Sequence, residues 1–137
     1  MMRLTNLADY AVVVMTEAAR CDGCASATRI AGKTGLPMPT AAKLLNALAR
    51  AGLLVSSRGV GGGFRLSRCP ETITLADIVE AVDGPIALTA CVARGHDTCE
   101  INQGCTARDH WPGVNMAVRG ALAAVTLGQL AGRREAV

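Results

Sequence analysis

The stretch from Leu53 to Leu66 reads L-L-V-S-S-R-G-V-G-G-G-F-R-L. Leu53–Val55 and Phe64–Leu66 have the apolar and β-branched or aromatic composition of short strands, and the glycines between them permit a tight reversal. We therefore predict a two-stranded β-wing. Glycine-rich loops that cradle nucleotide phosphates lie between a strand and a helix, whereas these glycines lie between two strands and no G-K-[ST] follows. A purely structural hairpin turn is the alternative reading.

Two helical segments precede this wing. Residues 26–34 are expected to form a short helix, residues 35–39 a turn, and Thr40 to cap a second helix that ends near Ala51. The second helix is predicted to bury one stripe, Ala41, Leu44, Leu45 and Leu48. Two helices joined by a short glycine-bearing turn and followed by a wing form a winged helix-turn-helix, which inserts its second helix into the DNA major groove.

Basic side chains occupy the outer face of this predicted unit. Thr40, Lys43 and Arg50 share the exposed face of the second helix, and Arg58 stands at the wing. Residues 1–70 carry nine Lys/Arg and three Asp/Glu, whereas residues 71–137 carry five and eight. A basic half that contains a helix-turn-helix favours nucleic acid as the partner, with an ordinary solvated surface as the alternative. The residues expected to contact DNA are Thr28, Pro39, Thr40, Lys43, Arg50, Ser57, Arg58, Gly59 and Gly61.

Helices are also predicted on both sides of this unit. Residues 4–19 have a helical apolar period, and Thr74 opens a further helix with a T-x-x-D capping box. From Pro112, apolar residues recur at spacings of three and four, as in a heptad seam: Trp111, Val114, Val118, Ala121 and Val125. Such a helix is expected to dimerise, although it could pack on its own chain. The fold class is therefore mainly α with a small β-wing, a winged helix-turn-helix plus a C-terminal dimerisation helix.

Three cysteines, Cys91, Cys99 and Cys105, follow a C-x7-C-x5-C pattern in a polar stretch broken by glycines. Thiolates on such a stretch can converge on a metal ion or an iron–sulfur cluster. The chain thus divides into a DNA-binding domain (1–85), a cysteine loop (86–110), and a dimerisation helix with its tail (111–137). Clustered thiols and the lack of a long apolar span predict a cytoplasmic location.

A second cysteine motif, Cys21-Asp22-Gly23-Cys24, falls in a predicted turn. A C-x-x-C pair is typical of a redox site or half of a zinc site, but this one has no second C-x-x-C and no adjoining strand–helix–strand pattern. A turn that merely carries thiols is the alternative. An enzyme is not expected, because the chain shows neither paired carboxylates in a cleft-like context nor a Ser/His/Asp grouping.

Several motifs together resemble the bacterial winged-helix iron–sulfur transcriptional regulators of the IscR/NsrR type. They are M-R-L-T-N-L-A-D-Y (residues 2–10), S-x-R-G-x-G-G-G-F-x-L-S-R (56–68), I-T-L-A-D-I-V-E-A-V-D-G (73–84) and the cysteine triplet. Residues 86–111 look most like the subgroup that regulates the Suf cluster-assembly operon. The resemblance implies a homodimeric repressor of cluster-assembly genes that binds double-stranded operator DNA. Nitric-oxide or redox sensing, or a zinc-stabilised DNA-binding protein, are the alternatives.

The same resemblance implies an iron–sulfur cluster of the two-iron or four-iron type. Its ligands would be Cys91, Cys99 and Cys105. The fourth ligand varies among the family. Asp9, donated by the partner chain, holds the position of the ligand in the nitric-oxide sensors, and His110 or His96 are the alternatives.

Overall fold

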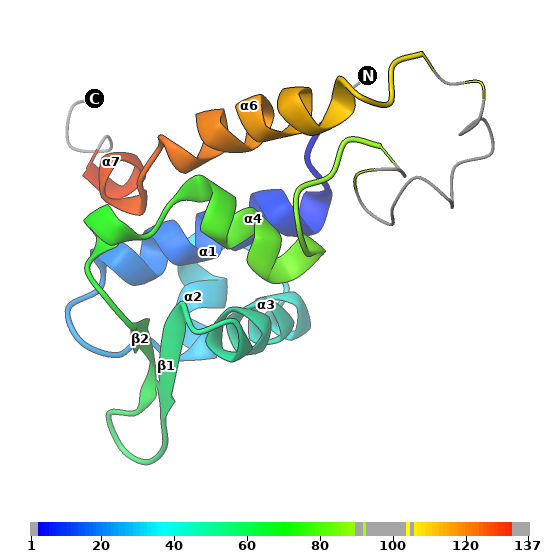
Figure 1. Ribbon diagram of the computed structural model, residues 1–137. Coiled ribbons are helices and arrows are strands. Elements are labelled where there is room, and N and C mark those ends of the chain that lie inside the picture. Colours follow the sequence, from blue (N-terminus) through cyan, green and yellow to red (C-terminus); the bar gives the residue numbers. More distant parts are fainter. Residues whose placement is uncertain (1–2, 90–91, 93–103, 105, 133–137) are drawn as a thin grey trace.

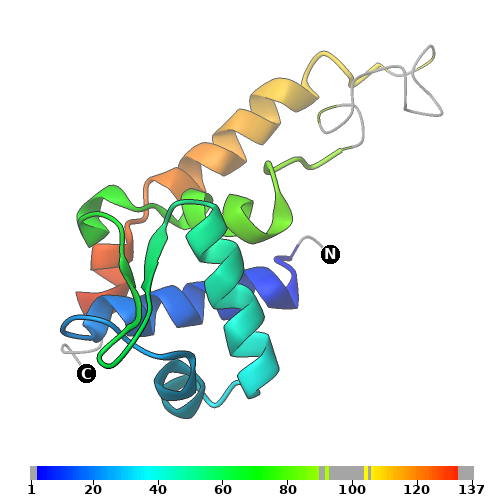
Figure 2. The same ribbon diagram turned by 90° about the horizontal axis from the view of Figure 1, so that it is seen from below.

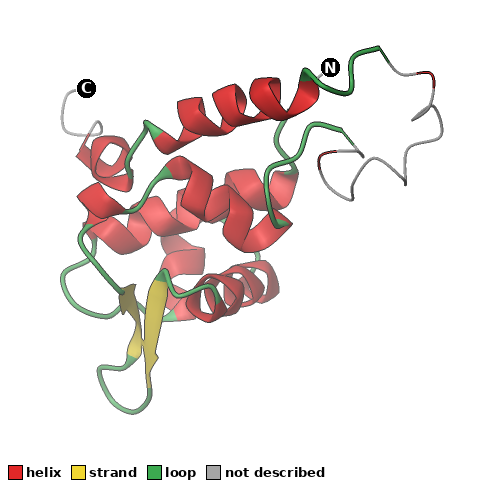
Figure 3. Ribbon diagram, viewed as in Figure 1, coloured by secondary structure: helices red, strands yellow, loops and turns green. Residues whose placement is uncertain are grey.

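The computed structural model describes residues 3–89, 92, 104 and 106–132. In chain order, the elements are α1 (Asn6–Arg20), α2 (Ala27–Thr34), α3 (Met38–Arg50), β1 (Leu54–Ser57), β2 (Gly63–Leu66), the 3-10 turn η1 (Pro70–Thr72), α4 (Leu75–Asp83), α6 (Trp111–Ala123) and α7 (Leu127–Gly132). Helices dominate and one two-stranded antiparallel sheet accompanies them (Figure 3), which confirms the predicted fold class.

Helix α1 lies at the centre and contacts α2, α3, α4 and α7 (Figure 1). The interior is built from aliphatic side chains, since aromatic residues make up only 2 % of the chain. Its largest fully buried side chains are Val14, Met15, Ile30, Leu44, Leu45, Leu48, Ile73, Ile78 and Leu127. The predicted stripe of α3 is confirmed, since Ala41, Leu44, Leu45 and Leu48 are all buried. The apolar period of residues 4–19 predicted a buried face that includes Leu4 but not Val14; in the structure Val14 is buried in α1, and Leu4, which precedes the helix, is exposed.

Hydroxyl caps fix the starts of α1, α2 and α4, whereas α3 and α6 have no side-chain cap. Thr5 accepts a hydrogen bond from the backbone N–H of Ala8, and Thr74 forms the predicted capping box with Asp77. The predicted cap at Thr40 is wrong, because α3 already begins at Met38 and Thr40 lies within its first turn. The proline after Met38 allows this earlier start, since the first turn of a helix needs no N–H from it.

The C-terminal helix is shorter than the predicted seam. Helix α6 ends at Ala123, so Val125 lies beyond it. The chain then returns to its own domain: the Leu75 N–H donates to the Val125 carbonyl at 2.9 Å, and the Leu127 N–H donates to the Ile73 carbonyl at 2.8 Å. Leu127 is fully buried in the core. Helix α7 therefore packs on its own chain, while α6 crosses the face of the domain opposite to the wing (Figure 1).

Within the described residues, no helix has both the length and the hydropathy needed to cross a bilayer.

Candidate DNA interface and anchor of the cysteine segment

Helices α2 and α3 form the predicted helix-turn-helix. Ser26 caps α2 by accepting from the Arg29 N–H at 3.1 Å, and Gly35 ends α2 in the left-handed conformation, with φ at +78°. That conformation favours glycine, and it redirects the chain into α3. Helices α2, α3 and the wing lie on the same side of the molecule (Figures 1 and 2), so one ligand surface can contact all three.

The outer face of α3 presents polar and basic side chains. Pro39, Lys43 and Arg50 are exposed, whereas Thr40, which was predicted to share their face, is half-buried. Thr28 is exposed on α2. Asn46, which was not among the predicted contacts, is also exposed on α3, three residues after Lys43. The spacing from Lys43 could have identified it, and an asparagine side chain can form a paired hydrogen bond with an adenine edge.

The wing pairs Leu54 with Leu66 and Ser57 with Gly63, so the turn comprises residues 58–62. Its predicted DNA-contact residues, Ser57, Arg58, Gly59 and Gly61, are all exposed. The turn depends on glycine, because a Cβ at Gly62 would lie 2.6 Å from the Ser57 carbonyl oxygen. The wing also presents Arg65, an exposed cation that was not among the predicted contacts.

The cations of this side are unpaired within the described part of the chain. The salt bridges there join Arg20 to Glu17, Arg68 to Asp77, Arg108 to Asp109 and Arg119 to Glu80. None involves the cations of α2, α3 or the wing, namely Arg29, Lys33, Lys43, Arg50, Arg58 and Arg65. Cations without a protein counter-ion, placed around α3, can bind the phosphate backbone, and phosphate contacts supply most of the affinity for DNA.

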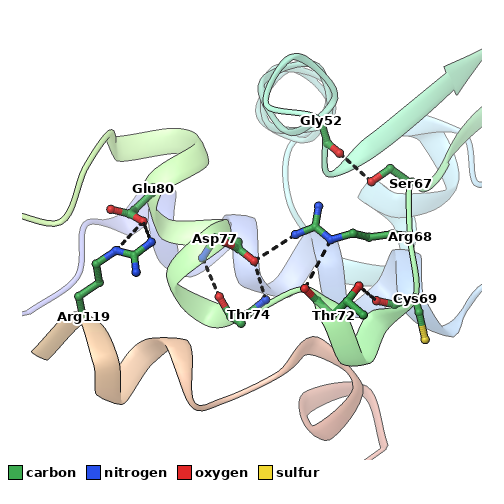
Figure 4. A network of polar contacts seen from close by, with 9 residues as sticks. All are labelled: Gly52, Ser67, Arg68, Cys69, Thr72, Thr74, Asp77, Glu80 and Arg119. Atoms are coloured by element: carbon green, nitrogen blue, oxygen red, sulfur yellow. Dashed lines mark hydrogen bonds and ion pairs between the residues drawn. The ribbon is translucent and has the colours of Figure 1, made fainter. Parts of the chain in front are cut away.

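A polar network connects the base of the wing to α4 (Figure 4). Ser67 donates to the Gly52 carbonyl at 2.6 Å, and the Arg68 guanidinium contacts an Asp77 oxygen at 3.2 Å. The same Asp77 oxygen accepts from the Thr74 N–H at the start of α4. The strand that leaves the wing is thus tied to the helix that leads toward the cysteine segment.

Residues 86–88, which follow α4, are held by two side chains. Asn115 of α6 is only 7 % exposed; its Oδ1 accepts from the Leu88 N–H and its Nδ2 donates to the Ile86 carbonyl, both at 2.8 Å. Glu80 of α4 accepts from the Ile86 N–H at 2.9 Å. Both ends of the asparagine amide bond to backbone, so α6 and this segment are joined by a contact that apolar packing could not supply.

Glu80 also connects α4 to α6 directly. One of its carboxylate oxygens accepts two hydrogen bonds from the Arg119 guanidinium, at 2.7 and 3.0 Å (Figure 4). These bonds are the main reason that the pKa of Glu80 lies below its ordinary value, although partial burial opposes the shift. The carboxylate raises the pKa of Arg119 in turn. The pair is therefore charged at neutral pH.

The three predicted cysteine ligands, Cys91, Cys99 and Cys105, and the alternative ligand His96 lie outside the described residues. Among the described ones, no group of three or more His, Cys, Asp and Glu side chains could hold a metal ion. Asp9 and His110 are exposed, and within the described part of the chain neither side chain has a hydrogen-bond or ion-pair partner. The first turn of α1 and the start of α6 lie on the same side of the molecule (Figures 1 and 2). A carboxylate or an imidazole without a partner has the donor chemistry to complete a ligand set of three thiolates.

A cavity of about 520 Å³ lies beside this anchor. It is lined by the segment before α1, the end of α4, residues 83–88 and the inner face of α6, where Val118 and Leu122 contribute. Val118 therefore faces its own domain, whereas Val114 and Ala121 of the same predicted seam are exposed. The seam is thus divided between an inner and an outer face of α6.

Comparisons with known proteins agree on one family. The family model described as "Rrf2: Iron-dependent Transcriptional regulator" matches residues 4–133. The HTH-type transcriptional regulator IscR of Photobacterium profundum is 32 % identical over 131 residues, which cover 94 % of this chain and 75 % of that protein. IscR of Klebsiella pneumoniae is 29 % identical over 136 residues, covering 98 % and 82 %.

Solved structures give the same picture. CymR (YrzC), the global cysteine regulator of B. subtilis, superposes with a TM-score of 0.75 at 29 % identity, covering 97 % of this chain and 98 % of that one. T. potens IscR superposes with a TM-score of 0.71 at 25 % identity, covering 99 % and 89 %. These relatives are regulators rather than enzymes, as the sequence predicted.

Proposed function

Because this chain belongs to the Rrf2 family of transcriptional regulators, we propose that it represses Suf-type cluster-assembly genes and senses iron–sulfur cluster status. DNA binding follows from the family and from the helix-turn-helix with its unpaired cations. The proposed sensor is the segment that carries Cys91, Cys99 and Cys105, whose thiolates would hold a two-iron or four-iron cluster. The cluster would assemble on these thiolates only when iron and sulfide are available, so its presence would report their supply.

The attachment of residues 86–88 carries this proposal. Asn115 and Glu80 fasten the chain just before the cysteine segment to both α6 and α4. Helix α4 packs in turn on α1 and α3, and Asp77 ties it to the base of the wing. If cluster binding orders the cysteine segment, that ordering would shift α4 and α6 and, through α4, the DNA-binding surface. Such a coupling is what a two-state switch requires.

A homodimer is part of the proposal. The outer face of α6 exposes Val114 at 43 % and Met116 at 73 %, beside the small residues Ala117, Gly120 and Ala121. Small residues allow two helices to approach closely, and apolar ones gain from being covered. A dimer would also present two recognition helices to paired half-sites and let Asp9 of one chain reach the cysteines of the other. Sedimentation of the full chain tests this: Val114→Glu should yield monomers, whereas the wild-type protein should sediment as a dimer.

Anaerobic purification with assays of iron and acid-labile sulfide tests the cluster. The proposal predicts a coloured protein that contains both, and loss of both after Cys91→Ala, Cys99→Ala or Cys105→Ala. Cys69→Ala is the matched control, because Cys69 is an exposed cysteine of the described DNA-binding domain. Zinc without sulfide would replace the proposed cluster by a structural zinc site. Asp9→Ala and His110→Ala, compared by the spectrum of the bound cluster, identify the fourth ligand.

A further inference from the structure

The turn between α1 and α2 carries two cysteines that the proposed cluster does not use. Cys21 is the C-terminal cap of α1, and its N–H donates to the Ala18 carbonyl at 3.3 Å. The chain bends at each of residues 21–23, and Gly23 adopts a φ of +78°. Both Cys21 and Cys24 are free thiols, and each is partly exposed. The motif is therefore accessible to small reagents.

The spacing of this motif suits an internal disulfide. The chain bends at residues 21–23, between the two cysteines, and cysteines two residues apart at a bend can reach the Cα separation of roughly 4.4–6.8 Å that a disulfide needs. Gly23 lets the backbone adjust between the two cysteines, because it tolerates a φ that other residues resist.

The residue that follows Cys24 attaches the turn to the wing. Ala25 is 1 % exposed, and it exchanges two backbone hydrogen bonds with Phe64 of β2, both at 2.8 Å. Contact is close here, since a Cβ on Gly63 would lie 2.6 Å from the Ala25 carbonyl oxygen. The next residue, Ser26, caps α2. A displacement of Cys24 therefore reaches both the wing and the helix-turn-helix within two residues.

We propose that Cys21 and Cys24 form a reversible disulfide that weakens DNA binding by shifting the base of the wing, independently of the cluster. The proposal rests on the DNA-binding role proposed above. The oxidant class is a low-molecular-weight disulfide such as oxidised glutathione. One cysteine thiolate attacks it, forming a mixed disulfide and releasing one glutathione thiolate; the second cysteine displaces the other. The glutathione S–S bond breaks and the protein S–S bond forms. The protein loses two electrons, and the two thiol protons leave with the two reduced glutathione molecules.

Cys69 provides an internal control. It is exposed, but its thiol donates to the Glu71 carboxylate at 2.6 Å, and it lies in the connection after β2 rather than in a C-x-x-C pair. Oxidation through the Cys21–Cys24 pair should therefore proceed equally in wild type and in Cys69→Ser. It should be abolished in Cys21→Ser and in Cys24→Ser.

Peptide mass analysis tests the bond directly. Trypsin cuts after Arg20 and Arg29, which releases residues 21–29 with both cysteines and no other. After equilibration of the full chain with oxidised glutathione, this peptide should have lost two hydrogens and should resist alkylation, and dithiothreitol should restore both thiols. A peptide that stays fully alkylated, or carries only glutathione adducts, overturns the proposal.

The effect on DNA binding is measured in a variant that lacks the proposed cluster ligands, Cys91→Ser/Cys99→Ser/Cys105→Ser. Oxidation of this variant should weaken operator binding by roughly tenfold, the equivalent of about one lost hydrogen bond to a charged group. Adding Cys24→Ser should remove the effect. If the disulfide forms but the affinity is unchanged, the regulatory part of the proposal fails. If the triple variant, unlike wild type, fails to bind DNA even when it is reduced, the comparison uses wild-type protein stripped of iron, in its oxidised and its reduced form. If wild type does not bind DNA at all, the proposed function itself fails, and the peptide result separates that failure from this one.

Discussion

Asn115→Ala removes the side chain that joins α6 to the chain before the cysteine segment. The variant deletes the acceptor of the Leu88 N–H and the donor to the Ile86 carbonyl. Asn115 is buried, and water replaces its amide only in part. The two backbone groups lie in partly buried positions, so each is left with an incomplete hydrogen-bond complement.

The expected loss of stability follows from these two contacts. Each hydrogen bond contributes about 1 kcal/mol net, and a backbone group left unpaired costs about a further 1 kcal/mol when it is partly buried. Alanine regains roughly 0.5 kcal/mol through its higher helix propensity. With two lost hydrogen bonds and two backbone groups left unpaired, the net loss in the free energy of unfolding is about 3–4 kcal/mol.

Urea unfolding followed by circular dichroism, at one protein concentration, measures this loss. Asn46→Ala is the matched control, because it makes the same change at an exposed position of α3 that has no side-chain hydrogen bond among the described contacts. The control should be neutral or more stable by a few tenths of a kcal/mol. The reasoning is refuted if the two variants unfold within about 0.5 kcal/mol of each other.

Three further changes test other parts of the structure. Lys43→Ala should weaken binding to all DNA sequences to a similar extent and reduce the slope of log affinity against log salt by about 0.9, if this side chain contacts a phosphate; an unchanged slope would exclude that contact. Gly63→Ala places a Cβ 2.6 Å from a backbone carbonyl, at a φ of +142°, and should lower stability by about 1–3 kcal/mol. Gly32→Ala, in open space on α2, should not destabilise, and equal melting temperatures for the two variants would contradict the clash. Glu80→Gln should be less stable than wild type at neutral pH, because the pKa of Glu80 is lowered in the folded state and its charged form therefore favours folding. That difference should vanish as the pH falls from the ordinary carboxyl range, about 4.3, through the lowered pKa of Glu80; a pH-independent difference in melting temperature would show that the Arg119 pair is not its source.

Local sequence signals were sufficient for the DNA-binding unit. The period of the apolar residues in α3, the T-x-x-D box at Thr74 and the glycines of the wing each act within a few residues, so their structural outcome could be predicted. The start of α3 was misplaced because threonine is a common cap, whereas the proline next to it allows an earlier start. The sequence contains both the threonine that favours a start at Thr40 and the proline that permits a start at Met38. Which of the two starts forms depends on how the turn after Gly35 packs.

The contacts that join the ends of the chain could not be predicted in this way. Asn115 interrupts an apolar helical pattern, which signals a buried polar partner, but nothing in the sequence indicates that the partner is the backbone of residues 86–88. The Glu80–Arg119 pair joins residues 39 positions apart. Helix α7 fills the core because residues 125–127 align with residues 73–75, a pairing that depends on the completed fold.

A titration of promoter DNA with cluster-loaded and cluster-free protein tests the central claim most directly. If the cluster controls DNA binding, the two forms should differ in affinity by at least about fivefold, the lower range of coupling between linked sites. Cys91→Ala/Cys99→Ala/Cys105→Ala should bind like the cluster-free form under all conditions, and Cys69→Ala should behave like wild type. Equal affinities for the loaded protein, the cluster-free protein and the triple variant would contradict the account.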